Sequence, residues 1–297
     1  MKKTVSLILF LVLIFAGTIN AKAAEVLYAA DKTSNLYTID KTTGAATLVG
    51  PMGISHVTAM AYDLINDTLY AVKGPYNDPN QGCLYTVNTT TGAANQVGCD
   101  ANMDHPTPGM DFHSNGTLYG IAPYNPRPMT LFSINTTNGL RTLIGASGID
   151  WSEGNGFAID QAGIGYLSNN SSPGNFYTIN LSTGSETSVG AHTYTGFPPF
   201  TSNVKIGSMS FDENGILYGA VSDGVGSNAN YLATINLTTA EVTFVANLPN
   251  DMDSIAFADI TDIEPSQIPT LSEWGMIFMS LILAGSAFWM MRRRQLA

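Results

Sequence analysis

The fold of this chain is decided by the stretch Leu36-Tyr37-Thr38-Ile39-Asp40-Lys41-Thr42-Thr43-Gly44-Ala45-Ala46-Thr47-Leu48-Val49-Gly50. It returns almost unchanged at 84–98, and in looser form at 131–145, 176–190 and 232–246. Alternating apolar and polar residues on both sides of a polar turn are typical of a β-hairpin. The repeated turn positions are Gly44, Gly92, Gly139, Gly184 and Ala240, at steps of 48, 47, 45 and 56 residues. Periods near 40–50 residues with this alternation predict a β-propeller.

The first repeat holds three strand-like segments, at 26–31, 35–40 and 45–50, whereas each later repeat holds four. The missing strand is found after the last repeat, at 254–260. A final strand that completes the first blade closes the ring and leaves no open sheet edge between the chain ends. We therefore predict an all-β, five-bladed propeller of twenty strands over residues 24–261. An open β-solenoid is the alternative, which the borrowed strand disfavours.

The turns have a consistent chemistry. Asp or Asn, two polar residues and then Thr-Gly fits a type I turn that ends in a left-handed glycine. Ala240 departs from this pattern and would cost about 1–2 kcal/mol in that conformation, which leaves a different fifth turn open. Asp63, Asp160 and Asp212 each follow the first strand of a blade, and we interpret them as turn-forming residues.

The two cysteines flank one of the predicted hairpins. With that hairpin centred on Thr91, Cys83 and Cys99 are directly opposed, which predicts a structural disulfide in an exported protein. A register slip of one residue is the alternative, because it would place the two side chains on opposite faces.

The N-terminus predicts export. Lys2-Lys3 precede an apolar stretch, Val5 to Ala16, and Ala21-Lys22-Ala23 fits a small-x-small cleavage site. We interpret residues 1–23 as a helical secretory signal peptide that signal peptidase removes. An uncleaved anchor helix is the alternative.

The C-terminus combines a short motif, an apolar run and a basic end. Ile268-Pro269-Thr270-Leu271-Ser272-Glu273-Trp274-Gly275 is followed by the 16 apolar residues from Met276 to Met291 and then by Arg292, Arg293 and Arg294. We predict a linker at 262–267, then a transmembrane helix whose three arginines act as a stop on the cytoplasmic side.

The whole segment 268–297 resembles the IPTL-CTERM sorting signal of Gram-negative bacteria, which is related to the PEP-CTERM signals. The resemblance implies that an exosortase-like transpeptidase recognises Ile268, Pro269, Thr270, Leu271, Trp274 and Gly275. It also implies a transient stay in the inner membrane, followed by transfer to the cell envelope, the outer surface or the medium. An ordinary single-span anchor is the alternative.

The charge of the predicted domain excludes one class of partner. Residues 24–268 hold 22 acidic and 6 basic side chains. Because an acidic surface repels phosphate backbones, we expect no nucleic-acid binding.

We expect a ligand at the channel mouth where the loops joining successive blades converge. Aromatic and ionisable residues are frequent in those loops, and the predicted ligand face consists of Tyr124, Trp151, Glu153, Tyr194 and Asp251. Rings that stack on a sugar or grip a peptide, beside carboxylate acceptors, favour a non-catalytic protein that binds an extracellular glycan, matrix component or protein.

Two alternatives stay open at this mouth. A carbohydrate-active hydrolase or lyase would use a pair of the loop acids, namely Asp104, Asp150, Glu153, Asp251 and Asp253. A metal would be held by a ring of equivalent positions, which are His56, Glu153, Lys205 and Asp251. We expect no cofactor, with calcium as the ion that loop carboxylates would suit if one binds. Residues 26–260 also resemble secreted bacterial propellers with WD-like repeats, a broad class that implies no catalytic residues here.

Overall fold

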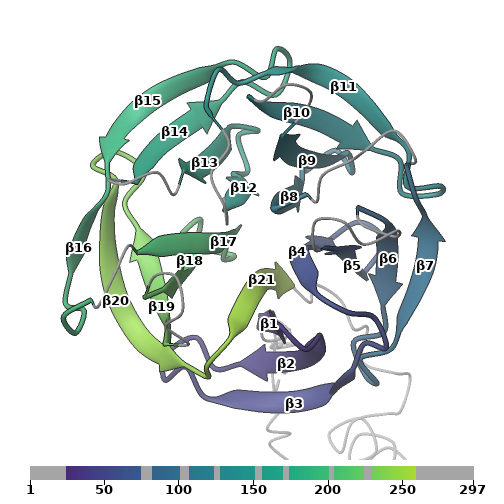
Figure 1. Ribbon diagram of the computed structural model, residues 1–297, viewed down its shortest axis with the longest axis horizontal. Helices are drawn as coiled ribbons and strands as arrows, with labels where there is room; N and C mark the ends of the chain where they lie inside the picture. Colours follow the sequence, from purple (N-terminus) through teal and green to yellow (C-terminus); the bar gives the residue numbers. More distant parts are fainter. Residues whose placement is uncertain are drawn as a thin grey trace, which may run out of the picture. The chain divides into compact units, whose positions relative to one another are not determined.

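The computed structural model of the chain describes residues 25–74, 82–100, 107–123, 128–150, 156–169, 174–200, 204–223 and 229–258. In this part, 21 strands form five sheets around a central axis (Figure 1). The predicted five-bladed β-propeller is therefore confirmed. From the axis outward, the blades are β21 (Met252–Ala258), β1 (Val26–Asp31), β2 (Asn35–Ile39) and β3 (Ala46–Pro51); β4 (Val57–Asp63), β5 (Thr68–Lys73), β6 (Leu84–Val87) and β7 (Ala94–Gly98); β8 (Gly109–Phe112), β9 (Leu118–Pro123), β10 (Met129–Ile134) and β11 (Arg141–Ala146); β12 (Phe157–Ile159), β13 (Gly165–Asn169), β14 (Asn175–Ile179) and β15 (Glu186–Ala191); and β17 (Lys205–Phe211), β18 (Leu217–Ser222), β19 (Asn230–Ile235), β20 (Glu241–Leu248) and β16 (Thr193–Thr195).

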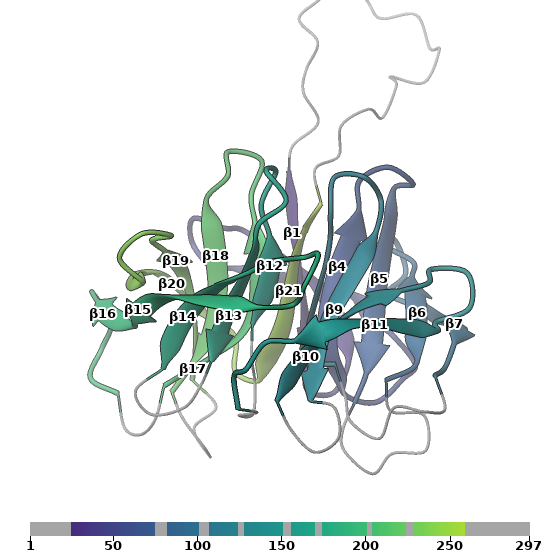
Figure 2. The same ribbon diagram turned by 90° about the horizontal axis from the view of Figure 1, so that it is seen from above.

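The ring is closed as the repeats predict. The last strand, β21, pairs antiparallel with β1, so that Val26 lies opposite Ala258 and Leu27 opposite Phe257. Because β1 begins where β21 ends, both ends of the propeller lie at the same face (Figure 2). We call this face the terminal face.

The hydrophobic core lies between the blades. Five clusters of buried side chains fill the five junctions between neighbouring sheets. In the first junction, for example, Leu36 of blade 1 and Met60 of blade 2 belong to one cluster, and Tyr28 stacks on Tyr62 with ring centroids 6.3 Å apart. Both faces of each sheet are therefore buried, which explains why the inner strands are apolar almost throughout.

The turn between the third and fourth strands is the same in all blades. In blade 1, the backbone N–H of Gly44 donates to the carbonyl of Asp40, whose side chain accepts from the N–H groups of Thr42 and Thr43. The fifth turn does not differ: Ala240 takes the left-handed conformation at φ +59°, close to the +72° of Gly44.

The disulfide between Cys83 and Cys99 is confirmed, and the sequence pattern hid part of its basis. Near the turn the hairpin has the slipped register, with Tyr85 opposite Gln96. A β-bulge between Leu84 and Tyr85 then restores the direct pairing of Leu84 with Gly98, and the cysteines lie one residue further along. The same bulge occurs in the other four blades.

One strand was missed by the sequence pattern. The segment expected to be a loop between blades 4 and 5 contains β16, which pairs in parallel with the outer strand β20 and makes blade 5 five-stranded. Figure 1 shows β16 outside β20, at the rim of the ring. The repeat step of 56 residues provides the extra length.

The predicted signal helix at 1–23 and transmembrane helix within 268–297 lie outside the described residues. Among the residues that are described, no helix is long and apolar enough to cross a membrane.

Candidate functional site

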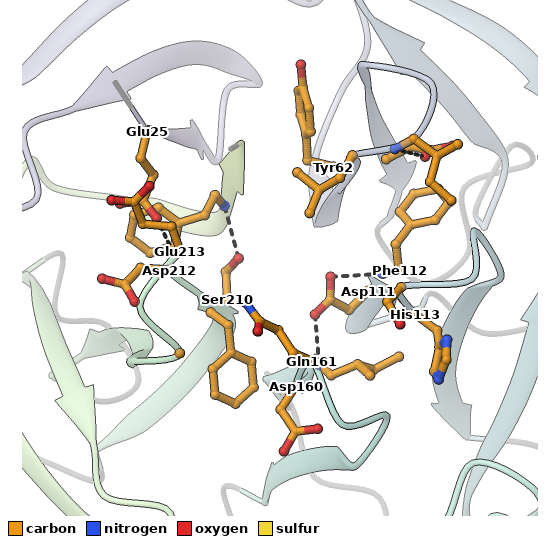
Figure 3. A pocket seen from close by; sticks show the side chains of 18 residues that line it. Glu25, Tyr62, Asp111, Phe112, His113, Asp160, Gln161, Ser210, Asp212 and Glu213 are labelled. Atoms are coloured by element: carbon orange, nitrogen blue, oxygen red, sulfur yellow. Dashed lines mark hydrogen bonds between the residues drawn. The ribbon is translucent and has the colours of Figure 1, made fainter. Parts of the chain in front are cut away.

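A pocket of about 220 Å³ opens at the terminal face, at one end of the central channel (Figure 3). The turns that join the first and second strands of blades 2 to 5 surround it, together with the start of β1 and the end of β21. Its lining residues are Glu25, Tyr62, Asp63, Leu64, Ile65, Asp111, Phe112, His113, Ser114, Ile159, Asp160, Gln161, Ser210, Phe211, Asp212, Glu213, Gly215 and Phe257.

The lining is both acidic and apolar. Its six carboxylates are those of Glu25, Asp63, Asp111, Asp160, Asp212 and Glu213, and none of the described lining residues is Lys or Arg. Four aromatic side chains contribute apolar wall, namely Tyr62, Phe112, Phe211 and Phe257. Such a pocket suits a positively charged group attached to an apolar body.

Three of the carboxylates fix the turns around the pocket, as the sequence predicts. The Asp63 side chain accepts from the N–H groups of Ile65 and Asn66. Asp212 does the same for Asn214 and Ile216. Asp160 accepts from the N–H of Ile164 and the hydroxyl of Tyr166, and its carboxylate turns away from the pocket centre (Figure 3).

Blade 3 makes this turn with a different residue. His113 stands where blades 2, 4 and 5 have Asp, and its Nδ1 accepts from the N–H of Asn115 at 3.0 Å. The imidazole therefore takes over the turn-forming role and brings a neutral or cationic ring to the pocket rim.

Lys41 connects two blades at the edge of the pocket. Its ammonium group contacts Glu25 Oε2 at 2.6 Å and Asp212 Oδ2 at 2.9 Å. Burial alone would lower the pKa of Lys41, but the hydrogen bonds and charges of these two carboxylates raise it above its ordinary value. The same contacts outweigh the burial of Asp212 and hold the pKa of its carboxyl below the usual range.

Asp111 is the lining carboxylate on an inner strand that fixes no turn. Its Oδ1 accepts from its neighbour Phe112 N–H at 2.9 Å, and its Oδ2 accepts from Ile159 N–H of the next blade at 2.8 Å. Burial raises the pKa of Asp111 to about 7, although both hydrogen bonds favour the ionised form. Asp111 and Asp212 therefore titrate in different ranges within one pocket.

The predicted ligand face is only partly described, and its described members are not together. Tyr124, Trp151 and Glu153 lie outside the described residues. Asp251 precedes β21 at the end away from the terminal face and pairs with Lys32 at 2.8 Å, where both side chains are well exposed. Tyr194 lies on β16, at the outer rim of blade 5 rather than at a channel mouth.

Tyr194 belongs instead to an aromatic cluster on blade 5. Its ring contacts Phe197 and Phe200, with centroids 5.8 and 5.4 Å away, and both of these also contact Tyr231. Next to it, His192 is buried between Ser168 Oγ at 2.9 Å and the carbonyl of Ala240 at 3.1 Å. Burial lowers the pKa of His192, and the cluster has the character of core.

Sequence reasoning treated Asp63, Asp160 and Asp212 as structural and passed over Asp111. The signal that would have found Asp111 is the alignment of the inner strands, where the other blades have Ala61, Ala158, Ser210 and Ala256. No group of three or more His, Cys, Asp or Glu side chains is placed to hold a metal ion among the described residues.

Comparisons with known proteins agree with both parts of the chain. The propeller is similar in fold to a chain in the crystal structure of a nidogen/laminin complex, at 9% sequence identity and a TM-score of 0.52. That similarity covers 79% of this chain and 98% of the other, and at this identity it shows the fold alone. No curated protein matches the chain in sequence.

The tail gives the more specific result. Residues 267–294 match the IPTL-CTERM motif, which confirms the resemblance that the sequence suggested. The protein thus combines a five-bladed β-propeller with an IPTL-CTERM sorting motif, and this motif indicates export to the cell envelope or surface.

Proposed function

We propose that this protein is a non-catalytic binding propeller of the cell envelope or surface, which holds an extracellular glycan, matrix component or protein at its channel-mouth pocket. Signal peptidase removes residues 1–23, and the apolar run Met276 to Met291 holds the chain in the inner membrane for a time. An exosortase-like enzyme then processes the tail at the motif Ile268–Gly275, and the propeller reaches its final location.

The observation that carries the binding role is how the pocket carboxylates are used. Asp63, Asp160 and Asp212 accept hydrogen bonds from turn amides, and Glu25 accepts from Lys41 and from the N–H of Glu213. A glycosidase needs one carboxylic acid free to donate its proton and a second carboxylate free to attack or to activate water. Groups fixed by backbone amides offer rigid acceptors for a ligand instead.

A carbohydrate-active hydrolase or lyase is the second candidate, and one observation favours it. The pKa of Asp111 is raised to about 7 whereas that of Asp212 is lowered, which is the pattern of an acid paired with an ionised carboxylate. Against this, both oxygens of Asp111 already accept N–H groups, so protonation would break one of these bonds.

The decisive experiment uses the mature protein recovered from its native envelope. Mass analysis of its C-terminal peptide should show that the chain ends near Ile268–Gly275. The same preparation is then incubated with envelope glycans and matrix proteins, and both retention and released products are measured. Retention without products supports binding, whereas released oligosaccharides would favour the hydrolase or lyase.

A pocket-blocking variant tests where the binding occurs. Ser114 lines the pocket and is exposed on its turn, so Ser114→Trp should obstruct the opening without disturbing the core. Ser182 is a comparably exposed turn residue of blade 4 that does not line the pocket, and Ser182→Trp is the matched control. Equal retention of both variants would place the binding elsewhere on the protein.

A further inference from the structure

Two inner-strand junctions do the same structural work with different chemistry. Ser210 Oγ accepts from Phe257 N–H at 2.9 Å, between blades 5 and 1. Asp111 occupies the equivalent position and accepts from Ile159 N–H at 2.8 Å, between blades 3 and 4. A neutral hydroxyl is therefore sufficient to join two inner strands.

The carboxylate of Asp111 is thus more than the junction requires. Burying a charge is unfavourable unless another charge or several hydrogen bonds compensate it. Two amides compensate it only in part, since burial still raises the pKa of the group. Among the described contacts of Asp111, neither is with a cation.

The pocket wall already binds one ammonium group, which belongs to the protein itself. Lys41 Nζ is held by Glu25 and Asp212 and lies 5.5 Å from the ring centroid of Phe257. Carboxylate oxygens combined with an aromatic face are a general solution for ammonium recognition. On the other side of the pocket, Asp111 and the ring of Phe112 present the same two elements to the open volume (Figure 3).

We infer that this pocket binds an aliphatic ammonium group, with Asp111 as its carboxylate partner and the apolar walls around its methylene chain. This inference rests on the proposed binding function and names the class of ligand. Neutral molecules of the same shape lack the charge that Asp111 needs, so the pocket discriminates against them. The ammonium comes either from a free diamine or from a lysine side chain of a protein.

The test is calorimetric titration of the full-length protein with cadaverine at pH 8 and low salt, where Asp111 is ionised. The isosteric neutral control is 1,5-pentanediol, and Nα-acetyl-lysine methylamide represents the protein side chain. We expect cadaverine to bind at least about tenfold more tightly than the diol. Tighter binding of the lysine derivative than of cadaverine would identify a protein as the source of the ligand.

Two variants show whether Asp111 is responsible. Asp111→Ser copies the residue of the blade 5 junction and should keep the fold while weakening cadaverine binding about tenfold or more. Asp160→Asn removes one charge from the same lining, but its carboxylate turns away from the pocket, so a loss of less than about threefold is expected. Equal losses in both variants would mean unspecific attraction and would overturn the inference.

The preference of the unmodified protein for cadaverine over the diol can be measured even if Asp111→Ser does not fold. Absence of this preference overturns the ammonium inference by itself. If the mature protein is nevertheless retained by envelope glycans or matrix and Ser114→Trp abolishes that retention, the binding function stands with a different ligand.

Discussion

The junction between blades 4 and 5 is built differently from the other four. In the first three junctions, a glycine of one outer strand lies against the left-handed turn glycine of the next blade, as Gly98 does against Gly139. A Cβ on Gly139 would come within 2.4 Å of the carbonyl oxygen of Gly98. At the fourth junction Ala240 replaces the turn glycine, and no atom lies within 4 Å of where a Cβ on Gly190 would be.

The comparison teaches that the close contact and the turn conformation are separate requirements. The turn needs a left-handed residue in every blade, and Ala240 meets that need at a modest cost. Glycine becomes indispensable only where two backbones touch. Where β15 stands off from the turn, the side chain of His192 bonds to the carbonyl of Ala240 and β16 covers the edge of β20.

The largest expected effect comes from breaking a glycine junction. Gly139→Ala adds a strained left-handed alanine and a clash with the backbone of Gly98, and should lower the free energy of unfolding by about 2–5 kcal/mol. Gly53 has the same φ of +73° but nothing within 4 Å of its Cβ position, so Gly53→Ala isolates the conformational cost of about 1 kcal/mol. Urea unfolding of both variants measures the difference, and equal losses would contradict the role of the contact.

The next effect concerns the covalent tie beside one of these junctions. Cys99 follows Gly98 directly, so its disulfide with Cys83 holds the strand end that contacts Gly139. Replacing both cysteines by alanine should lower the stability by about 3 kcal/mol in the chain-entropy model. Reduction of the unmodified protein should reproduce this loss, and reduction of the double variant should change nothing. Unchanged unfolding midpoints after reduction would exclude a stabilising role.

The exceptional junction should be sensitive to pH. Because burial depresses the pKa of His192 below its unfolded value, the unfolded chain binds more protons, and stability is lost as the pH falls below about 6.5. We expect the thermal midpoint of the unmodified protein to fall more steeply between pH 7.5 and 5 than that of His192→Gln. Parallel curves for the two proteins would show that His192 does not contribute.

The smallest effect is expected from restoring glycine at the exceptional turn. Ala240→Gly relieves the left-handed alanine but loses a fully buried methyl group and increases the freedom of the unfolded chain. These contributions nearly cancel, and the stability should change by less than about 1 kcal/mol. A gain above about 2 kcal/mol in urea unfolding would mean that Ala240 is strained beyond its turn conformation.

The sequence predicted the elements with a periodic signal and missed those without one. The repeat and the borrowed strand predicted five blades and the closing strand β21, because both follow from spacing. Strand β16 has three residues and pairs in parallel, so no alternation or hairpin turn marks it. The disulfide was predicted with an unshifted register, and a bulge that no residue type announces made the pairing correct.

The candidate site was expected at the wrong end for the pocket that is described. Aromatic and charged residues are frequent in the blade-joining loops, whereas the pocket lies at the opposite, terminal face. Its lining comes from residues that local patterns explain as turn-forming, such as Asp63 and Asp212. Composition shows which residues a loop contains, but the convergence of four turns on one channel is a property of the closed ring.

The sequence by itself determined the number of blades, the closure of the ring and the sorting motif, because each depends on residues that are close in the chain or repeat at a fixed spacing. Tertiary structure alone decided which carboxylates share a pocket and where glycine is required. Lys41 and Asp212 are 171 residues apart, and they meet only because the last strand joins the first blade. The charge of Asp111 likewise acquires a meaning only beside Ile159 and Ser210, in a channel that exists once all five inner strands stand together.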